Sequence, residues 1–145
     1  MKIDIVVPGA PVAKPRAKGF YNKKTEKMHH YYKNDKELKN YEQFIKVKAS
    51  ELFEKPLTGP ICLSVHFLMP RPQNLMWKTK EMPRVPCGKR PDVDNLVKTI
   101  EDALNGIAYL DDGQITELHV WKQYHAGDEG PKTVIRVEED NATGT

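Results

Sequence analysis

The sequence lacks the features that mark membrane proteins, secreted disulfide proteins and repeat proteins. It has only two cysteines, Cys62 and Cys87, and their spacing matches no zinc or redox motif. We therefore expect both to be reduced thiols of an intracellular protein. No apolar run is long enough to span a bilayer, and no signal peptide or internal repeat is evident. These absences predict a cytoplasmic protein with no membrane partner.

Charge is present in both signs but is unevenly distributed. Residues 1–55 carry 13 Lys and Arg against 7 Asp and Glu, whereas residues 56–145 carry 10 against 13. A basic front and an acidic rear suit a phosphate-binding surface beside a metal-binding pocket. The length of 145 residues suits one domain (1–145) that can bury a core.

The apolar pattern predicts an α+β fold, a small mixed sheet of about four strands with helices packed on one face. Amphipathic stripes with a period near 3.6 predict helices over about 34–53 and 93–107. Alternating or apolar runs predict strands over 3–7, 61–68, 115–122 and 133–138, and we expect the last two to pair as a hairpin. The acidic tail 139–145 is expected to fray.

Residues 70–91 are rich in proline and cations and predict no regular element. Long loops in small domains are usually functional or disordered, so we expect a mobile flap over nucleic acid. Trp77 in this flap has two open interpretations: it stacks on bases, or it packs against its own loop or a second subunit.

Residues 12–24 contain five cations and two aromatic residues but no acid. This composition is common in nucleic-acid-binding loops, which predicts phosphate contacts by Lys14 and Arg16. The alternative is a solvated loop whose charges only keep the protein soluble.

Acidic residues flank the second predicted helix. Asp92 and Asp94 stand at its start, and Asp111 and Asp112 follow its end. Two carboxylates about 5 Å apart repel by roughly 3 kcal/mol at an effective dielectric near 20, and a divalent cation removes that conflict. Oxygen ligands favour Mg²⁺ or Mn²⁺. The alternative is that the first two acids are helix caps and the second two belong to a surface turn.

A calcium-binding EF-hand is excluded by two residues. If the loop began at Asp92, Val97 would occupy the position that needs glycine, and Ala103 the position that needs a bidentate acid.

Three short segments, in order, resemble the RusA family of Holliday junction resolvases. The family pattern is an Asp-x-Asp-Asn-Leu-x-Lys segment, an Asp-Ala-Leu segment, and an Asp-Asp-x-Gln segment followed by an aliphatic residue. The matching stretches here are Asp92 to Lys98, Asp102 to Leu104, and Asp111 to Ile115. A weaker likeness extends over most of the chain.

The resemblance implies Mg²⁺-dependent cutting of four-way DNA junctions by a homodimer, with no organic cofactor. It implies that Asp92, Asp94 and Asp112 are the metal ligands and that Lys98 assists catalysis. Asp111 remains the alternative ligand. Neighbouring side chains of an extended segment point to opposite faces, so only one of Asp111 and Asp112 would enter the site. Lys98 has an alternative as the partner of an i,i+4 ion pair.

The resemblance also bears on DNA contacts and on the kind of genome that encodes such proteins. We expect Lys89 and Arg90, beside the first acids, to contact phosphates together with Lys14 and Arg16. The family is common in phage and prophage genomes. Two rival functions stay open: a nuclease of the same fold that acts on flaps or forks, and a DNA-binding module in which the acids are structural.

Overall fold

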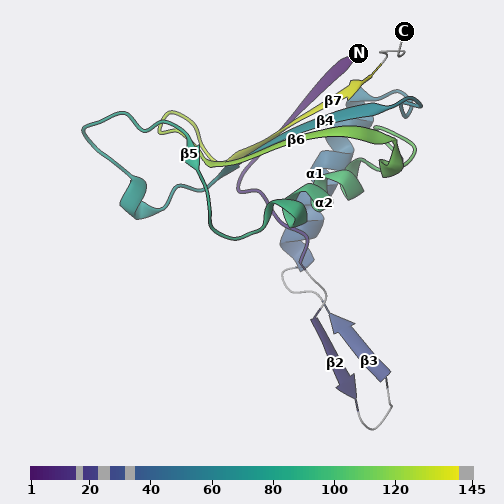
Figure 1. Cartoon of the computed structure of the whole chain (residues 1–145), viewed down its shortest axis with the longest axis horizontal. Coiled ribbons are helices and arrows are strands. Elements are labelled where there is room, and N and C mark those ends of the chain that lie inside the picture. The colour runs from purple at the N-terminus through teal and green to yellow at the C-terminus, as the bar shows by residue number, and fades with distance from the viewer. Residues whose placement is uncertain (16–17, 23–26, 32–34, 141–145) are drawn as a thin grey trace.

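The computed structural model describes residues 1–15, 18–22, 27–31 and 35–140. Five strands form one mixed sheet in the order β1-β7-β4-β6-β5 (Figure 1). Their bounds are Lys2–Pro8 for β1, Ile61–Met69 for β4, Val85–Pro86 for β5, Ile115–Tyr124 for β6 and Lys132–Glu139 for β7. The α+β class and the four long strands are confirmed, and β4 is central as its apolar alternation predicts.

The strand count of about four was too low. The short β5 lies inside the segment predicted to be irregular, and a separate two-stranded sheet pairs β2 (Lys18–Asn22) with β3 (Lys27–Tyr31). Residues 18–22 fall within the segment 12–24, whose five cations favoured a loop, although Phe20 and Tyr21 themselves prefer strands. A two-residue strand that contains proline has no periodicity by which to find it.

The predicted hairpin between the last two strands is wrong. β4 lies between them, parallel to β6 and antiparallel to β7. The long connection from β4 to β6 contains helix α2 (Val93–Leu104), and such a crossover returns the chain to the same end of the sheet. Residues 125–131 then carry the chain past β4 to its other side.

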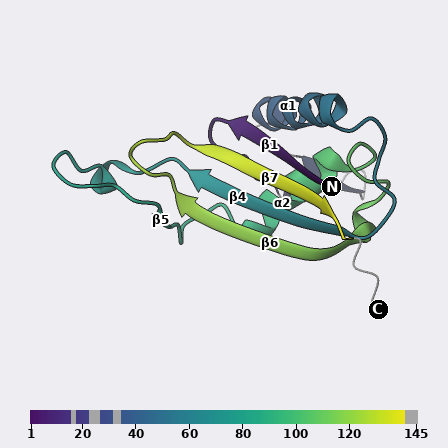
Figure 2. The same ribbon diagram turned by 90° about the horizontal axis from the view of Figure 1, so that it is seen from above.

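Both long helices lie on one face of the sheet, as predicted. Helix α1 (Asp35–Leu52) contacts β1 and α2, and in the view of Figure 2 the sheet covers α2. Every second residue of β4 is fully buried toward the helices, whereas Cys62, Ser64 and His66 face the open side. The apolar stripe of α2 is buried against this core through Leu96, Val97, Ile100, Ala103 and Leu104. No helix in the described ranges is long and apolar enough to cross a membrane.

The segment 70–91 projects from one end of the sheet beside the β6–β7 connection (Figure 1). It contains the 3-10 turn η1 (Gln73–Leu75) as well as β5, so it is not wholly irregular. Arg71 is buried and donates hydrogen bonds to the carbonyls of Leu75, Pro83 and His125. Trp77 packs within its own loop, 4.9 Å from the Arg71 guanidinium carbon and 4.2 Å from Lys80 Nζ. The mobility of this flap stays a prediction.

An ion pair at the base of the flap predicts a pH-dependent stability. Arg84 makes hydrogen bonds of 2.8 and 2.9 Å to Glu129 and thereby lowers the pKa of Glu129 from 4.5 to about 2. Because the folded pKa is depressed, this contribution is present above pH 4.5 and is lost as the pH falls towards 2. In urea denaturation, Glu129→Gln should lower the free energy of unfolding at pH 6, and the gap from wild type should shrink at pH 3. The matched variant Glu37→Gln, exposed on α1, should show no such gap; an equal gap at both pH values would contradict the account.

Candidate active site

Helix α2 presents two acids at its start. Asp92 occupies the N-cap position and Asp94 lies in the first turn, and both are exposed. The N-cap position of Asp92 agrees with one interpretation of the sequence. The Asp92 side chain accepts no capping hydrogen bond, so only the position is confirmed. The helix dipole favours negative charge here, by about 0.3–1 kcal/mol per acid. The Asp92 carboxylate therefore makes no capping hydrogen bond and is free to bind a ligand at the start of the helix.

A lysine from β6 positions the approach to these acids. Lys122 Nζ donates to the carbonyls of Lys89 and Pro91 at 2.7 and 2.8 Å, and the Lys122 carbonyl accepts from the backbone N–H of Cys87. This role of Lys122 was not predicted from the sequence. Its one signal was a cation on the helix-facing side of a strand, in register with the buried Phe67.

The far end of α2 is closed by a left-handed glycine and a buried tyrosine. Gly106 has φ of 82°, as the Asn-Gly pair after the helix predicts. Tyr109 is fully buried, and its hydroxyl donates to the Glu101 carbonyl at 2.9 Å. The chain therefore turns back under α2 and brings residues 110–114 beside the last turn of the helix.

The 3-10 turn η2 (Asp112–Gln114) then fixes the acid pair. Asp111 accepts a hydrogen bond from the N–H of Gly113, while Gln114 Oε1 accepts from the N–H groups of Leu110 and Asp111. Gln114 Nε2 donates to the carbonyls of Leu57 and Gly59. The Asp111 carboxylate thus caps the turn through its hydrogen bond, whereas Asp112, the first residue of η2, is exposed.

Several acidic side chains lie where η2 meets α2. The pKa of Glu101 is raised by burial and then by the carboxylates of Asp112 and Asp102, with Lys98 acting in the opposite direction. The pKa of Tyr109 is raised well above its usual value by burial and by the same group of acids. Glu101 was not among the predicted site residues, although it lies seven residues after Asp94 on the polar side of the helix. A cation at this position would relieve the repulsion.

Lys98 lies between the two acidic ends of the helix. It is exposed, one turn beyond Asp94 and one turn before Glu101. With a rise of 1.5 Å per residue, Asp94 and Glu101 are separated by about 10 Å along the axis. The positive charge of Lys98 therefore lies between the carboxylates of Asp94 and Glu101.

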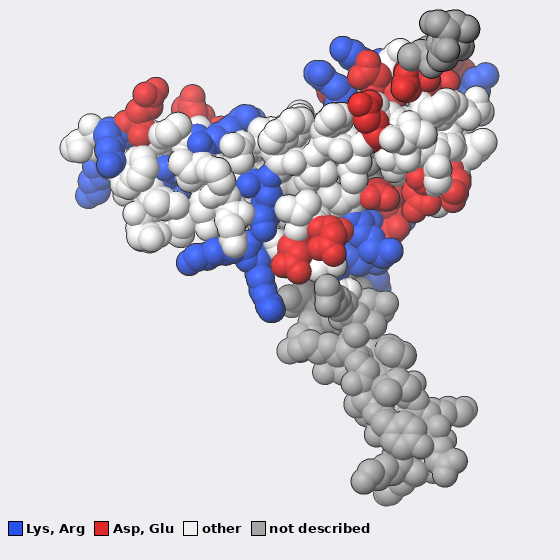
Figure 3. Space-filling model, in the orientation of Figure 1, with Lys and Arg blue, Asp and Glu red and all other residues white. Residues whose placement is uncertain are grey.

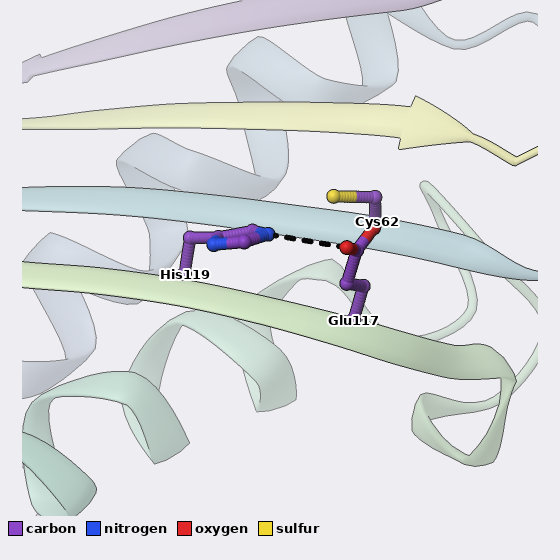
Figure 4. A group of neighbouring side chains, drawn as sticks. All are labelled: Cys62, Glu117 and His119. Carbon is purple, nitrogen blue, oxygen red and sulfur yellow. Dashed lines mark ion pairs between the residues drawn. The ribbon is translucent and has the colours of Figure 1, made fainter.

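The structure does not bring the three predicted aspartate ligands into a tight cluster. In residues 1–15, 18–22, 27–31 and 35–140, the one group of three potential ligands with all donor atoms within 4.8 Å is Cys62, Glu117 and His119. That group faces the open side of the sheet, away from α2 (Figure 4). The aspartates are instead arranged along the polar side of α2, with Asp92 and Asp94 at one end and Asp112 near the other.

The predicted phosphate contacts have different surroundings. Lys89 and Arg90 are exposed immediately before Asp92. Lys14 lies between the helices: its backbone N–H donates to the Asn95 carbonyl, and its Nζ is 2.6 Å from Asp102 Oδ2. Arg16 lies outside the described residues. In Figure 3, Lys and Arg side chains adjoin acidic side chains on the surface of this region.

Known proteins that resemble this chain identify its family. The chain matches the family described as endodeoxyribonuclease RusA over residues 8–138. The chain belongs to the RusA family. It is also 32% identical to the uncharacterised protein YqaN of Bacillus subtilis over 146 residues, which covers 97% of this chain and 98% of that one. The resemblance carried by the three aspartate segments is thereby confirmed, and RusA membership indicates an endodeoxyribonuclease.

The glutamine of the third RusA segment has a structural role that can be tested. Gln114→Ala removes four hydrogen bonds from a half-buried side chain, which should cost about 1–3 kcal/mol in urea denaturation. Because Asp112 would then be misplaced, DNA cleavage should fall by up to about 100-fold while DNA binding is retained. Gln43→Ala, exposed on α1, is the matched control and should change neither quantity. Full cleavage by Gln114→Ala would show that this turn does not position the site.

Proposed function

We propose that this protein is a Mg²⁺-dependent, structure-specific endodeoxyribonuclease that resolves four-way DNA junctions by paired, symmetric nicks. One observation carries the proposal: in a RusA-family chain, the turn at Gln114 uses Asp111 and leaves Asp112 exposed beside the acidic side of α2. This arrangement supports Asp112 as the ligand of the pair.

The residues fit a hard divalent cation by the chemistry of their donors. All of them are carboxylates, and burial together with the neighbouring carboxylates of Asp112 and Asp102 raises the pKa of Glu101 beside them. Mg²⁺ commonly keeps several waters and binds through one or two carboxylates together with substrate phosphates, so a tight protein cluster is not required. When bound, the ion would polarise the scissile phosphate and supply a water of lowered pKa, and Mn²⁺ can substitute.

The side chains divide into three roles in this proposal. Asp92, Asp94 and Asp112 hold one or two ions. Lys98 contacts the phosphate and stabilises the negative charge that develops on it. Lys89 and Arg90 bind the flanking DNA backbone, where each released counterion adds salt-dependent affinity.

Lys14, which lies between the two helices, adds a cation to this surface. Lys14 and Arg16 are proposed phosphate contacts, and a phosphate at Lys14 would share or replace the Asp102 partner. The flap 70–91, whose far end contains Lys89 and Arg90, is proposed to close over the bound DNA.

Paired cuts require two sites. A four-way junction has near two-fold symmetry, so a homodimer with a dyad axis would present one active site to each of two opposed strands. The second protomer is accordingly part of the proposed function.

Substitution of single carboxylates tests the site. Asp92→Asn, Asp94→Asn and Asp112→Asn should each lower Mg²⁺-dependent cleavage of a synthetic four-way junction by about 100-fold or more, with binding in a mobility-shift assay nearly unchanged. Asp111→Asn should reduce cleavage less, since its loss acts through the turn. Asp128→Asn, exposed in the β6–β7 connection, is the control and should cut at the wild-type rate.

The same assay separates the alternatives. Cleavage of flaps or forks in preference to the junction would indicate a related nuclease of different substrate choice. Full activity in all three aspartate variants would remove this site altogether, and binding without any cleavage by wild type would indicate a DNA-binding module.

A further inference from the structure

A second cluster of potential ligands lies on the open face of the sheet, apart from the acids of α2. Cys62 comes from β4, and Glu117 and His119 come from β6. Their donor atoms, the thiol sulfur, a carboxylate oxygen and an imidazole nitrogen, all lie within 4.8 Å of one another. Figure 4 shows the three side chains converging above the two strands.

The sheet register explains this convergence. β4 and β6 are parallel neighbours in which Cys62 pairs with Glu117 and Ser64 with His119. Glu117 and His119 are two residues apart and therefore project from the same face of β6. A register irregularity between Ile61 and Cys62 sets this pairing, so the cluster depends on the backbone as well as on flexible side chains.

We propose that Cys62, Glu117 and His119 bind a thiophilic divalent transition metal of the Zn²⁺ class, with solvent in the fourth position. Tetrahedral Zn²⁺ binds thiolate sulfur at about 2.3 Å and imidazole nitrogen or carboxylate oxygen at about 2.0–2.2 Å, which places ligand atoms about 3.3–3.6 Å apart. Glu117 Oε1 and His119 Nε2 are 3.5 Å apart. This pair is already near the required spacing.

The surrounding charge favours a cation. The hollow beside the thiol has a volume of about 220 Å³ and is lined by Cys62, Glu117, Glu138, Glu139 and Asp140. Glu138 is the partner of Cys62 across β4 and β7, so the thiol lies between two carboxylate-bearing strands. If the exposed His119–Glu117 contact were only a surface ion pair, it would add little to the stability of the protein. Such a pair would also not explain why a thiol lies at the same point.

The donor set separates this site from the proposed catalytic site. Thiolate and imidazole strongly favour Zn²⁺, Co²⁺ or copper over Mg²⁺, whereas a set of carboxylates alone also suits Mg²⁺. The cluster lies on the face of the sheet opposite to α2. An ion here would join the start of β6 to β4, three residues after the end of η2, and would stabilise the strand that follows Asp112.

Cobalt spectroscopy on the full-length protein tests the proposal, because a thiolate bound to Co²⁺ gives a charge-transfer absorption in the near ultraviolet. With Mg²⁺ in excess to saturate carboxylate sites, wild type should bind one Co²⁺ per chain with this absorption, and Zn²⁺ should abolish it by competition. Cys62→Ser should lack the absorption and bind Zn²⁺ at least about tenfold more weakly. Cys87→Ser is the matched control, since Cys87 is the chain's other thiol and is buried away from the cluster.

Thermal unfolding with and without Zn²⁺ provides a second readout. Zn²⁺ should raise the Tm of wild type and Cys87→Ser but not that of Glu117→Gln or His119→Gln, two exposed substitutions that should leave far-ultraviolet circular dichroism unchanged. No thiolate absorption in wild type, or its persistence in Cys62→Ser, would overturn the proposal. Neither result bears on junction cleavage, which is measured separately with Mg²⁺.

Discussion

Burial of one face of α2 is the constraint on which the site depends. The helix packs Leu96, Ile100 and Leu104 into the core, and each such side chain contributes about 1.5–3 kcal/mol when it is removed from water. This anchoring fixes the opposite, polar side of the helix in space. The acids of α2 are therefore held at fixed positions along one side of the helix. The candidate site is completed by Asp112, which the turn η2 places beside the last part of the helix.

The two ends of α2 are fixed by different means. At the start, Lys122 of β6 holds the carbonyls of Lys89 and Pro91, so the central part of the sheet determines where Asp92 begins the helix. At the far end, Tyr109 and the four hydrogen bonds of Gln114 fold the chain back beside Glu101. A substrate phosphate and a cation could thus meet a surface whose geometry is set before they arrive, which is how preorganised sites stabilise a transition state.

Periodicity in the sequence was sufficient to predict both long helices and the four long strands, since their apolar residues recur at helical or strand spacing. It failed where strand pairing depends on a connection: β6 and β7 are adjacent in sequence, yet β4 separates them because the crossover through α2 makes β4 and β6 parallel. The three RusA segments predicted the family, which the comparison confirms. They could not reveal Glu101, whose proximity to Asp112 arises from the turn after the helix. Nor could they reveal the cluster at Cys62, which exists only through the register of two strands.

The central claim is that carboxylates at both ends of α2 bind one set of divalent cations. A crystal of the protein soaked in Mn²⁺ tests it most directly, because anomalous scattering locates the ion independently of activity. The account predicts anomalous density on the acidic side of α2, in direct contact with the Asp112 carboxylate, that is lost in Asp112→Asn crystals. Density confined to the open face of the sheet, or density beside α2 that persists in Asp112→Asn, would contradict it.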